Sequence, residues 1–439
     1  MRDHDSTDVV VVGGGLAGLA AAALTARLGR RVRLLEKAGE LGGRATTQTK
    51  DGYAFNIGPH ALYRKGGGMR TLELLGIGPE GSVPLGSGAW AVRGGAKHAL
   101  PGGFFSLLTT GLFGLAGKIE LARLLGRVQS IDPEPLQGLT VAEGLERLAQ
   151  RPEVRELIAA MFRLTSYGNA PRLQSAGASL EQLQLALSGN VLYLHGGWQQ
   201  MVDELRKVAL ASGVEIESGA RVDAVETASV AGATHVVRVA DGRSIACAAV
   251  ILALAPGDAA ALLDGTARAT VARWAADAVP IEAACLDLAL ARLPEPRSTF
   301  ALGIDRPLYL SVHSAVARLA PQGGALVHVA KYLDPDEPAD ATRDQRELEQ
   351  LMDLVQPGWR AHVVHRRFLP HVVVSNAVVR AAHRGLAGRP GPDVPGVPGL
   401  YVAGDWVGRE GMLADASLSS ARRAAEHCVR AVPALAVAA

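Results

Sequence analysis

The pattern of apolar and polar positions at the start of the chain predicts a strand, a helix and a second strand in close succession. Asp8–Val12 is a β-branched run that breaks into a glycine-rich turn, and an Ala- and Leu-rich stretch then continues to Leu28. A second apolar run, Val32–Leu35, ends at Glu36. Short β-branched runs favour strands, whereas the longer stretch of good helix formers favours a helix. The N-terminal segment therefore predicts a β-α-β unit.

The turn inside this unit has the spacing of a dinucleotide-binding fingerprint. It reads Gly13-Gly14-Gly15-Leu16-Ala17-Gly18. In such a fingerprint Gly13 allows the tight turn, Gly15 lets a phosphate approach the backbone, and Gly18 lets the helix pack against the strand. Leu16 and Ala17 open the helix, whose first N–H groups and positive dipole end would face a pyrophosphate. A glycine loop that binds nothing is disfavoured, because the flanking strands and helix agree with the motif.

The carboxylate at the end of the second strand indicates which nucleotide is bound. Glu36 lies where an acidic side chain accepts a hydrogen bond from a ribose 2′-hydroxyl, and it would repel the 2′-phosphate of NADP. The next phrase, Glu40-Leu41-Gly42-Gly43-Arg44-Ala45, resembles the flavin amine oxidase, protoporphyrinogen oxidase and phytoene desaturase superfamily. The resemblance implies that Glu36 binds the FAD ribose and that Lys37, Gly43 and Arg44 lie against the cofactor. Arg44 would offer its fork of donors to phosphate, although a solvated surface arginine is the alternative.

A second signature lies near the C-terminus. The phrase Gly399-Leu400-Tyr401-Val402-Ala403-Gly404-Asp405-Trp406 predicts a turn, a short buried strand and a Gly-Asp corner. It is similar to the C-terminal flavin motif of the same superfamily, which implies that Asp405 binds the ribityl chain. The two motifs stand in the order that the family requires, and together they are far more specific than either motif alone.

A helix is predicted directly after this corner. The segment Met412-Leu413-Ala414 leads into it, and the helix itself is expected over Ala416–Val429 with Asp415 or Ser417 as its cap. The resemblance places Met412, Leu413 and Ala414 at the cofactor. The positive end of the helix would stabilise the negative charge that builds on the flavin as it is reduced.

The resemblance also implies an α/β fold with a discontinuous, Rossmann-like FAD-binding domain of the GR2 type. We assign this domain to residues 1–75, 196–265 and 386–439. A second domain, with a mixed sheet and helices on one side, would bind the substrate and comprises residues 76–195 and 266–385. The resemblance further implies that the backbone of Val222 lies against the adenine, although an ordinary core valine would show the same pattern.

Apolar periodicity predicts further elements in both parts of the chain. Helical spacing marks residues 118–128, 141–150, 153–164, 180–187, 199–211 and 341–355. Strand-like runs occupy residues 214–216, 235–240, 244–246, 249–254, 284–290, 308–312, 325–332 and 363–368. The turn Asp241-Gly242 between two alternating runs predicts a hairpin, and the uninterrupted run 249–254 predicts a strand covered on both faces.

Composition narrows the class of protein. The chain has 439 residues, of which 48% are hydrophobic and 51 are glycine, and its formal net charge is +2. This length suffices for two domains, and the lack of a basic block argues against nucleic acid as a partner. The three cysteines have no metal-ligand spacing and cannot form a complete disulfide framework, and the polar N-terminus does not resemble a signal peptide. We therefore expect no metal and a cytoplasmic location.

A long uncharged stretch between Ala99 and Gly117 leaves two interpretations open. Pro101 and several glycines interrupt it, so it lacks the ~20 dominantly apolar residues of a membrane-spanning helix. One interpretation is a loop followed by a buried helix. The other is an exposed patch of Phe and Leu side chains that makes peripheral contact with a membrane or admits a lipophilic substrate.

Two side chains are candidates for a catalytic role. In the family that the chain resembles, the segment Asn56-Ile57-Gly58-Pro59-His60 passes the face of the isoalloxazine, with Gly58 and Pro59 in close approach. His60 is then a candidate proton acceptor or orienting donor, and its alternative is a hydrogen-bonded structural histidine. Lys331 lies in an apolar strand-like run. Several amine oxidases place a lysine near flavin N5, but strand alternation could equally point Lys331 to solvent.

Departures from the family pattern bear on the substrate and on how FAD is attached. Aromatic residues make up 4% of the chain and none follows Trp406, which disfavours an aromatic cage for a small amine. No cysteine lies between Leu400 and Asp415, so we expect FAD to be bound non-covalently. The phrase Leu413–Ala425 looks most like proteins of the phytoene desaturase type, which implies an apolar substrate.

These observations predict an FAD-dependent dehydrogenase or desaturase that removes a hydride from a hydrophobic or polycyclic substrate. Oxygen, a quinone or another acceptor would reoxidise the flavin. One alternative is a flavin oxidase of amines or porphyrinogens that releases hydrogen peroxide. Another, from a different class, is a non-catalytic lipid carrier like the GDP-dissociation inhibitors, which share the fold but lack an intact flavin motif.

Overall fold

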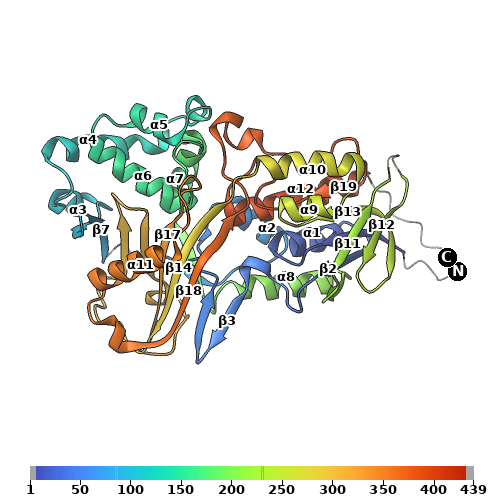
Figure 1. Ribbon diagram of the computed structural model, residues 1–439, viewed down its shortest axis with the longest axis horizontal. Coiled ribbons are helices and arrows are strands. Elements are labelled where there is room, and N and C mark those ends of the chain that lie inside the picture. The colour runs from blue at the N-terminus through green and yellow to red at the C-terminus, as the bar shows by residue number, and fades with distance from the viewer. Residues whose placement is uncertain (1–5, 85, 87, 229, 231, 432–439) are drawn as a thin grey trace.

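The structure is a computed structural model that describes residues 6–84, 86, 88–228, 230 and 232–431. Helices and strands mix throughout these ranges, and two large sheets lie next to each other along the long axis of the molecule (Figure 1). The α/β class expected from the sequence is confirmed. A group of helices covers the end of the molecule beyond the second sheet (Figure 1).

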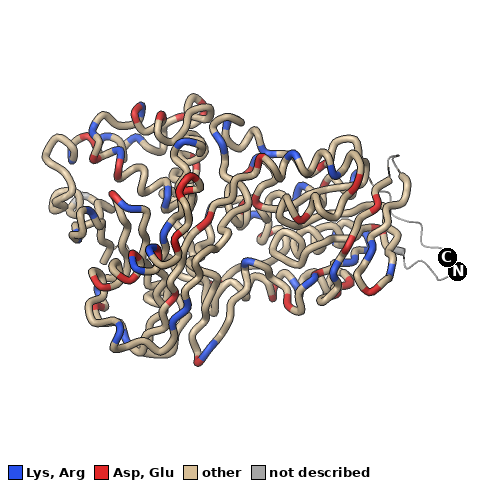
Figure 2. The backbone as a smooth tube through the Cα atoms, in the orientation of Figure 1, with Lys and Arg blue, Asp and Glu red and all other residues tan. Residues whose placement is uncertain are grey.

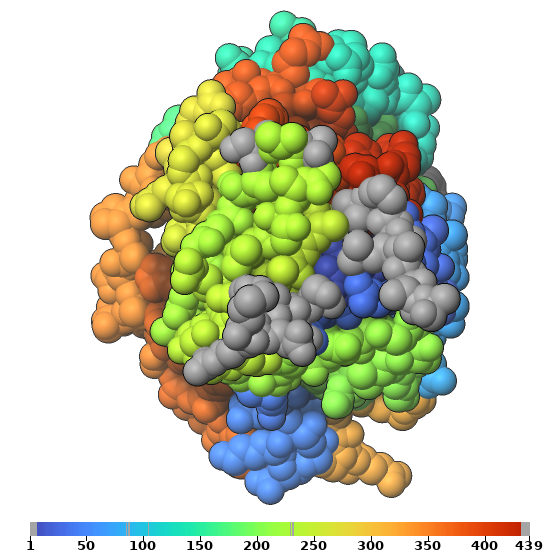
Figure 3. All heavy atoms as spheres, turned by 90° about the vertical axis from the view of Figure 1, so that its right-hand side faces the viewer, coloured from blue at the N-terminus to red at the C-terminus, as the bar shows by residue number. Residues whose placement is uncertain are grey.

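The first sheet combines strands from three distant parts of the chain. Its order is β10-β2-β1-β13-β12-β11, and β19 pairs with β13. The strands are β1 (Ser6–Val12), β2 (Val32–Glu36), β10 (Glu215–Ser218), β11 (Val222–Glu226), β12 (His235–Val239), β13 (Ser244–Leu252) and β19 (Leu400–Val402). β1 pairs in parallel with β2 and β13, whereas β12 is antiparallel to both of its neighbours. Figure 3 shows this end of the molecule, where the yellow-green hairpin strands lie beside the dark blue N-terminal segment.

Helices cover both faces of the first sheet. They are α1 (Leu16–Arg27), α8 (Gln199–Ala211) and α12 (Leu413–Ala431) on one face, and α9 (Pro256–Ala261) and α10 (Gly265–Asp277) on the other. Val9 and Val11 of β1 belong to the core with α1, while Val10 belongs to the core with α10. Because β1 is buried on both faces, its apolar run is uninterrupted. α10 packs with the first sheet, although the sequence analysis ended this segment of the FAD-binding domain at residue 265. The domain boundaries stay a prediction.

The second sheet is mixed and mostly antiparallel. Its order is β18-β14-β17-β16-β15-β7-β8. The strands are β7 (Ala89–Arg93), β8 (Ala96–Ala99), β14 (Ile281–Leu290), β15 (Phe300–Gly303), β16 (Leu308–Val312), β17 (Ala325–Tyr332) and β18 (Val363–Ser375). Only β7 and β15 pair in parallel among these described strands. Helix α11 (Ala341–Val355) covers one face of the sheet.

Smaller elements connect the two sheets and form the helical end. The helices are α2 (Gly67–Leu74), α3 (Phe104–Thr109), α4 (Leu115–Arg127), α5 (Val141–Leu148), α6 (Pro152–Ser166) and α7 (Ala176–Gly189). The short strands are β3 (Thr47–Lys50), β4 (Tyr53–Asn56), β5 (Leu62–Tyr63), β6 (Gly81–Ser82) and β9 (Val191–Leu194). The segment between β4 and β5 contains the predicted pocket floor.

Most of the predicted elements exist, and several have the predicted bounds. The elements expected at 199–211, 308–312, 325–332 and 341–355 are confirmed residue for residue. The strand expected at 363–368 is longer than predicted, since β18 continues through Pro370 to Ser375. Pro370 is tolerated because β18 is an edge strand and its pairing with β14 shifts register there.

The uncharged stretch 99–117 combines features of both interpretations. It forms α3 and the first turn of α4. Leu112 and Phe113 are buried in the core of the helical end. Phe105, Leu108 and Leu115 are exposed to solvent over 80%, 52% and 77% of their surfaces. Two apolar side chains of this stretch are therefore buried in the protein core, and three others are exposed to solvent.

Candidate functional site

The turn after β1 can be made only by glycine at two positions. Gly13 has a φ of +106°, which L side chains rarely adopt. A Cβ on Gly18 would overlap the carbonyl oxygen of Gly13. Helix α1 can therefore begin directly above the turn only because Gly18 lacks a side chain. These are the conformational roles that the fingerprint assigns to the two residues.

An open cradle remains on the other side of this turn. The nearest atom to a Cβ on Gly15, apart from chain neighbours, would be 3.9 Å away, and for Gly43 the distance would be 3.8 Å. No side chain caps the N-terminus of α1. The first N–H groups of this helix, at Leu16 and Ala17, therefore remain available to a ligand. The donor set and the free space fit a phosphate group.

Glu36 lies at the edge of the same cradle. Its carboxylate accepts hydrogen bonds from the backbone N–H of Gly14 at 2.6 Å and of Ala38 at 2.8 Å. Each carboxylate oxygen keeps a further lone pair, so Glu36 can still accept a hydrogen bond from a ribose hydroxyl. Val222 begins β11 within two residues of Ala220, whose N–H donates to the Glu36 carbonyl oxygen at 2.9 Å. The two residues that the resemblance links to adenosine are thus close together.

Lys37 lies apart from the cradle. Its side chain is largely exposed, and its Nζ is 3.9 Å from a carboxylate oxygen of Asp258. An exposed ion pair of this kind contributes little to stability.

The N-terminal and C-terminal motifs meet in an ion pair. Arg44 donates to Asp405 at 2.9 Å across 361 positions of the chain. Asp405 is 1% exposed and also accepts from the backbone N–H and the side-chain amide of Asn376, at 3.1 and 2.8 Å. Burial alone would raise the pKa of Asp405, but Arg44 and Asn376 outweigh it and lower the pKa. Asp405 is therefore an ionised, fixed acceptor, and Asn376 is a partner that the sequence did not indicate.

A partly buried arginine that the sequence did not indicate lies beside the start of α12. Arg389 donates to the carbonyl oxygen of Gly411 at 2.9 Å, while its Nε has no partner among the described residues. Burial lowers its pKa to about 10, partly offset by Asp405, so it stays charged at neutral pH. Arg389 shares a small cavity with Met412 and Leu413. A partly buried cation with an unpartnered Nε–H fits an anionic ligand at this position.

Helix α12 starts earlier than predicted, and the prediction that Asp415 or Ser417 caps it is wrong. The helix begins at Leu413, which has a φ of +56°. Asp415 instead accepts from the backbone N–H of Gly68 at 2.8 Å and so caps the first turn of α2. Ala414 packs against the core of the first sheet.

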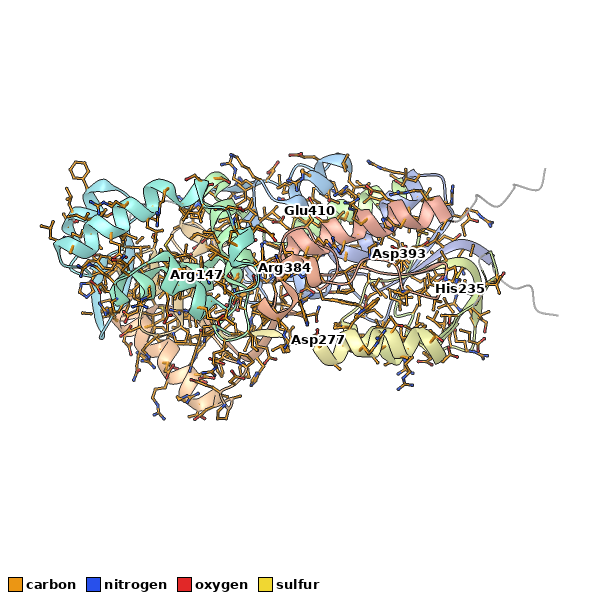
Figure 4. All side chains as sticks on the ribbon, turned by 90° about the horizontal axis from the view of Figure 1, so that it is seen from above. Arg147, His235, Asp277, Arg384, Asp393 and Glu410 are labelled. Carbon is orange, nitrogen blue, oxygen red and sulfur yellow. The ribbon has the colours of Figure 1, made fainter. Side chains whose placement is uncertain are left out.

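A second carboxylate ties the start of α12 to α2. Glu410, labelled in Figure 4, accepts from Arg422 of α12 at 2.8 Å and also pairs with Arg70 of α2. The loop that carries Met412 is thereby held on both sides.

His60 is occupied by the protein's own carbonyl groups. Its Nδ1 lies 3.1 Å from the carbonyl oxygen of Gly58, and its Nε2 lies 3.2 Å from that of Arg44. The ring contacts Trp198 edge to face, with centroids 4.7 Å apart. Burial lowers the pKa of His60 to about 4, so the ring is neutral at pH 7. A neutral ring carries one N–H, so His60 donates to only one of these two carbonyl oxygens; this contact supports the structural interpretation, and the catalytic role stays a prediction.

Gly58 and Pro59 face the second sheet. A Cβ on Gly58 would lie 2.9 Å from the sulfur of Cys285 on β14, and its φ is +74°. The Tyr167 hydroxyl donates to the Pro59 carbonyl oxygen at 3.3 Å. The predicted pocket floor therefore packs on one particular face of the second sheet, called here the inner face.

Lys331 is not on the inner face. Its neighbours Val327 and Val329 pack with α11, and strand alternation puts Lys331 on the same side. Its ammonium group pairs with Asp344 at 2.7 Å and with Glu347 at 2.9 Å, both on α11. The structure therefore separates Lys331 from Gly58 by the thickness of the sheet, which speaks against the catalytic assignment. The side chain is also not free in solvent, as the alternative assumed.

The inner face carries a buried charge network instead. Asp287 of β14 and His328 of β17 are opposite each other in the ladder, and Asp287 Oδ1 is 2.6 Å from His328 Nδ1. Arg367 of β18 donates to Asp287 Oδ2 from Nε at 3.1 Å and from Nη2 at 2.6 Å. Burial would raise the pKa of Asp287, but His328 and Arg367 outweigh it and lower the pKa. Arg367 also donates to the Asn56 carbonyl oxygen, which links this network to the pocket floor.

Aromatic side chains and a second histidine border this network. His313 stacks on Tyr193 with centroids 3.8 Å apart, and it meets His328 edge to face at 4.6 Å. Tyr309 and Tyr332 lie on the same face, with ring centroids 6.4 Å apart. The sequence reasoning missed all of these residues. The available signal was a polar residue inside an otherwise apolar strand, at Asp287 and at His328.

Comparison with known proteins gives a consistent result. The model of a family described as "Flavin containing amine oxidoreductase" matches residues 16–429. The chain is 51% identical over 59 residues to the carotenoid 3,4-desaturase of Haloarcula japonica, which is 13% of this chain and 12% of that protein. It is 24% identical over 260 residues to the 4,4′-diaponeurosporene oxygenase of Staphylococcus aureus, half the length of each. The chain thus matches half or less of these relatives.

A solved structure shares the fold over nearly the whole chain. It is an oxidoreductase from Methanosarcina mazei, with a TM-score of 0.75 and 19% identity. The similarity covers 94% of this chain and 98% of the other. At this identity the likeness establishes the architecture alone.

Proposed function

Because this chain belongs to the flavin-containing amine oxidoreductase family, we propose that it removes a hydride from a hydrophobic or polycyclic molecule. The protein is an FAD-dependent oxidoreductase, and FAD when bound supplies the hydride acceptor at its N5 atom. Oxygen, a quinone or another oxidant then takes the electrons. The substrate and this final acceptor are the proposed part.

The contact between Arg44 and Asp405 carries this proposal. It joins the two motifs that the family places around one cofactor, and it does so with an ionised, buried carboxylate. In the proposed assignment Glu36 holds the ribose, the cradle at Gly15 and Gly43 holds the diphosphate, and Asp405 holds the ribityl chain. Non-covalent attachment follows from the absence of a cysteine in the C-terminal motif. An intact set of these residues argues against the non-catalytic carrier.

Two observations support an apolar substrate. Relatives that match parts of the chain are named as a carotenoid desaturase and a diaponeurosporene oxygenase. The inner face of the second sheet packs directly against Gly58 and Pro59, so a substrate bound beside this contact would be shielded from water by protein on two sides. Enclosure orients the donor carbon and excludes water, which is the protein's main task in hydride transfer to a flavin.

One observation favours an amine or porphyrinogen oxidase as the second candidate. Aromatic residues are rare in the chain, but the fold gathers several of them on the inner face. Tyr167 and Tyr332 have centroids 5.8 Å apart, and Phe300 and Tyr309 have centroids 5.5 Å apart. Such a cluster can bind a cationic or flat aromatic substrate through its ring faces.

Anaerobic reduction of the bound flavin distinguishes the candidates. The purified protein is mixed without oxygen with polyenes, polycyclic hydrocarbons, amines and a porphyrinogen, and loss of the yellow flavin band is recorded. Bleaching by a polyene or polycyclic donor supports the proposal, whereas bleaching by amines, with peroxide release on admitting air, supports the second candidate. A protein that stays colourless with added FAD would exclude both.

We further propose peripheral contact with a membrane through the exposed side of α3 and α4. Phe105, Leu108, Leu115 and Ile119 are exposed by 44% to 80%. Helix α3 has no Lys, Arg, Asp or Glu, and the tip that it forms is uncharged in Figure 2. Lys118 follows on α4, where a cation favours an anionic lipid surface. The described residues contain no helix with the length and apolar character needed to cross a bilayer.

Vesicle flotation tests the membrane contact. Wild type is expected to float with vesicles of mixed neutral and anionic phospholipid, and the double variant Phe105→Ser, Leu115→Ser is expected to stay in solution. Leu210→Ser is the matched control, because Leu210 is 49% exposed on α8, far along the chain from this tip. Equal flotation of all three proteins would refute the assignment to α3 and α4.

A further inference from the structure

The inner face of the second sheet differs from its other face in chemistry. Along β14 and β17, Leu286, Leu288, Val327 and Val329 pack with α11 in an aliphatic core. The alternate positions carry Asp287 and His328, which face the pocket floor at Gly58 through Cys285 and Arg367. An antiparallel sheet normally buries apolar residues on a covered face. This one instead buries a carboxylate and an imidazole.

The charge network fixes the tautomer of His328. Asp287 is 0% exposed, and Arg367 donates to its Oδ2 atom from both Nε and Nη2. His328, also 0% exposed, donates its Nδ1 proton to Asp287 at 2.6 Å. In the tautomer with its proton on Nδ1, Nε2 is the ring nitrogen left to accept a hydrogen bond, and the Asp287 contact fixes its direction.

That acceptor has no partner in the described part of the chain. His328 Nε2 is fully buried and makes no hydrogen bond, and the same holds for Nδ1 of His313, 4.6 Å away between ring centroids. The hydroxyl of Tyr332, on the same face, is a third such atom. Buried polar atoms are nearly always hydrogen-bonded, so unpartnered atoms on one face need an explanation. The described residues include no group of His, Cys, Asp or Glu arranged to hold a metal ion.

We infer that the inner face recognises an oxygen-bearing substrate, with His328 Nε2 as the acceptor for a hydroxyl group on an otherwise hydrophobic molecule. This inference rests on the proposed function and names the substrate class within it. His313, whose ring lies beside that of His328, offers a further polar atom to that oxygen. Asp287 is a positioning residue, because it acts only by holding His328 in the correct tautomer. A purely hydrocarbon substrate would leave both histidine nitrogens unsatisfied, which disfavours its binding.

Equilibrium binding of matched probes tests the inference. The FAD-loaded protein is titrated with 2-decalol and with decalin, and with hexadecanol and hexadecane, and binding is followed by the shift of the flavin absorption band. Wild type is expected to bind at least one alcohol about ten-fold or more tightly than its hydrocarbon. His328→Phe is expected to bring that ratio to about one, and His328→Gln, which keeps an acceptor, to restore part of it.

A buried histidine elsewhere provides the control. His235 lies on β12 of the first sheet, is 1% exposed and bonds the Pro398 carbonyl oxygen (Figure 4). His235→Phe is expected to lower the melting temperature without changing the alcohol preference. Melting temperature and flavin content are recorded for every variant, so that a general loss of folding is recognised.

Each outcome bears on the inference. Equal binding of alcohol and hydrocarbon in wild type, no binding of any alcohol up to its solubility limit, or an unchanged preference in His328→Phe would overturn it. Different results would contradict the proposed function. These are a purified protein that does not retain FAD, or a bound flavin that none of the tested donors reduces.

Discussion

The two sides of the candidate site are built in contrasting ways. On the first sheet, the cradle uses backbone N–H groups, glycines and the strand-end Glu36, all within one stretch of chain. On the second sheet, the inner face uses side chains from β14, β17 and β18 that meet only because three strands pair. The first side is a local motif that binds a constant cofactor. The second side is a product of strand pairing, so a single substitution on one strand alters the set of side chains that meet there.

The strongest way to break the cofactor side is to add one methyl group at Gly18. Gly18→Ala places a Cβ against the Gly13 carbonyl oxygen and forces α1 away from the turn. We expect a loss of about 3 kcal/mol in the free energy of unfolding and nearly complete loss of bound FAD. Denaturant titration and flavin absorbance measure the two effects. Gly257→Ala, where a Cβ meets no atom within 4 Å, should behave like wild type.

The matching change on the substrate side is Asp287→Asn. It leaves Arg367 and His328 without their shared carboxylate, and removal of one partner of a buried ion pair costs about 3 kcal/mol. FAD content is expected to stay near wild type, because the cradle is on the other sheet. The double variant Asp287→Leu, Arg367→Leu should recover part of the stability. If Asp287→Asn abolished FAD binding at unchanged stability, the two sides would not be separable.

His60, which lies between Gly58 and Arg44, makes the free energy of unfolding depend on pH. In the unfolded chain its pKa is near 6.5, whereas in the folded protein burial lowers the pKa to about 4. The unfolded state therefore binds more protons over this window, and the free energy of unfolding decreases as the pH falls from 6.5 to about 4. The decrease amounts to at most about 3 kcal/mol.

The effect of His60 on stability can be distinguished from that of Asp415, whose shifted pKa changes the pH dependence in the opposite direction. The distinction comes from comparing the stability–pH profile of each variant with that of wild type. Burial raises the pKa of Asp415 to about 7, so the folded protein binds more protons than the unfolded chain between about 4 and 7. His60→Gln is expected to remove the loss of stability at low pH, and Asp415→Asn to stabilise the protein near pH 8. Unfolding titrations at a series of pH values test both, and parallel profiles for wild type and His60→Gln would disprove the assignment.

A smaller effect is expected when only the ribose contact is lost. Glu36→Arg removes a charged acceptor worth about 1.5–3 kcal/mol, which corresponds to roughly ten- to hundred-fold weaker FAD binding. Dialysis followed by flavin fluorescence measures the affinity. Glu40→Arg, an exposed acid four positions later, is the control with the same change of charge. Equal flavin retention in both variants would remove Glu36 from the cofactor site.

The smallest effect on the site is expected from Lys331→Met. Lys331 lies on the face of the second sheet that α11 covers, away from both sides of the site. FAD content and the flavin absorption spectrum should match wild type, even if stability falls because Asp344 and Glu347 lose their partner. A changed flavin spectrum in this variant would restore the catalytic assignment for the lysine.

The sequence predicted the secondary elements well in two cases. One is a strand buried on both faces, and the other is a helix whose apolar residues recur with the helical period. The runs at β16 and β17 and the amphipathic α8 and α11 were found with correct bounds. Predictions failed where tertiary context overrides local preference. β18 continues through Pro370 because an edge strand needs no donor there, and α12 begins at Leu413 because α2 takes Asp415 as its own cap.

The sequence by itself determined the cofactor side, because glycine conformation, helix polarity and a strand-end carboxylate are properties of neighbouring residues. Only the tertiary structure decided the rest. It paired Arg44 with Asp405, placed Lys331 on the face of the second sheet that α11 covers, and set Asp287 opposite His328. The physical reason is that a one-residue change of strand register turns every side chain to the other face. Which polar residues share a site therefore depends on pairings between segments that the linear order does not specify.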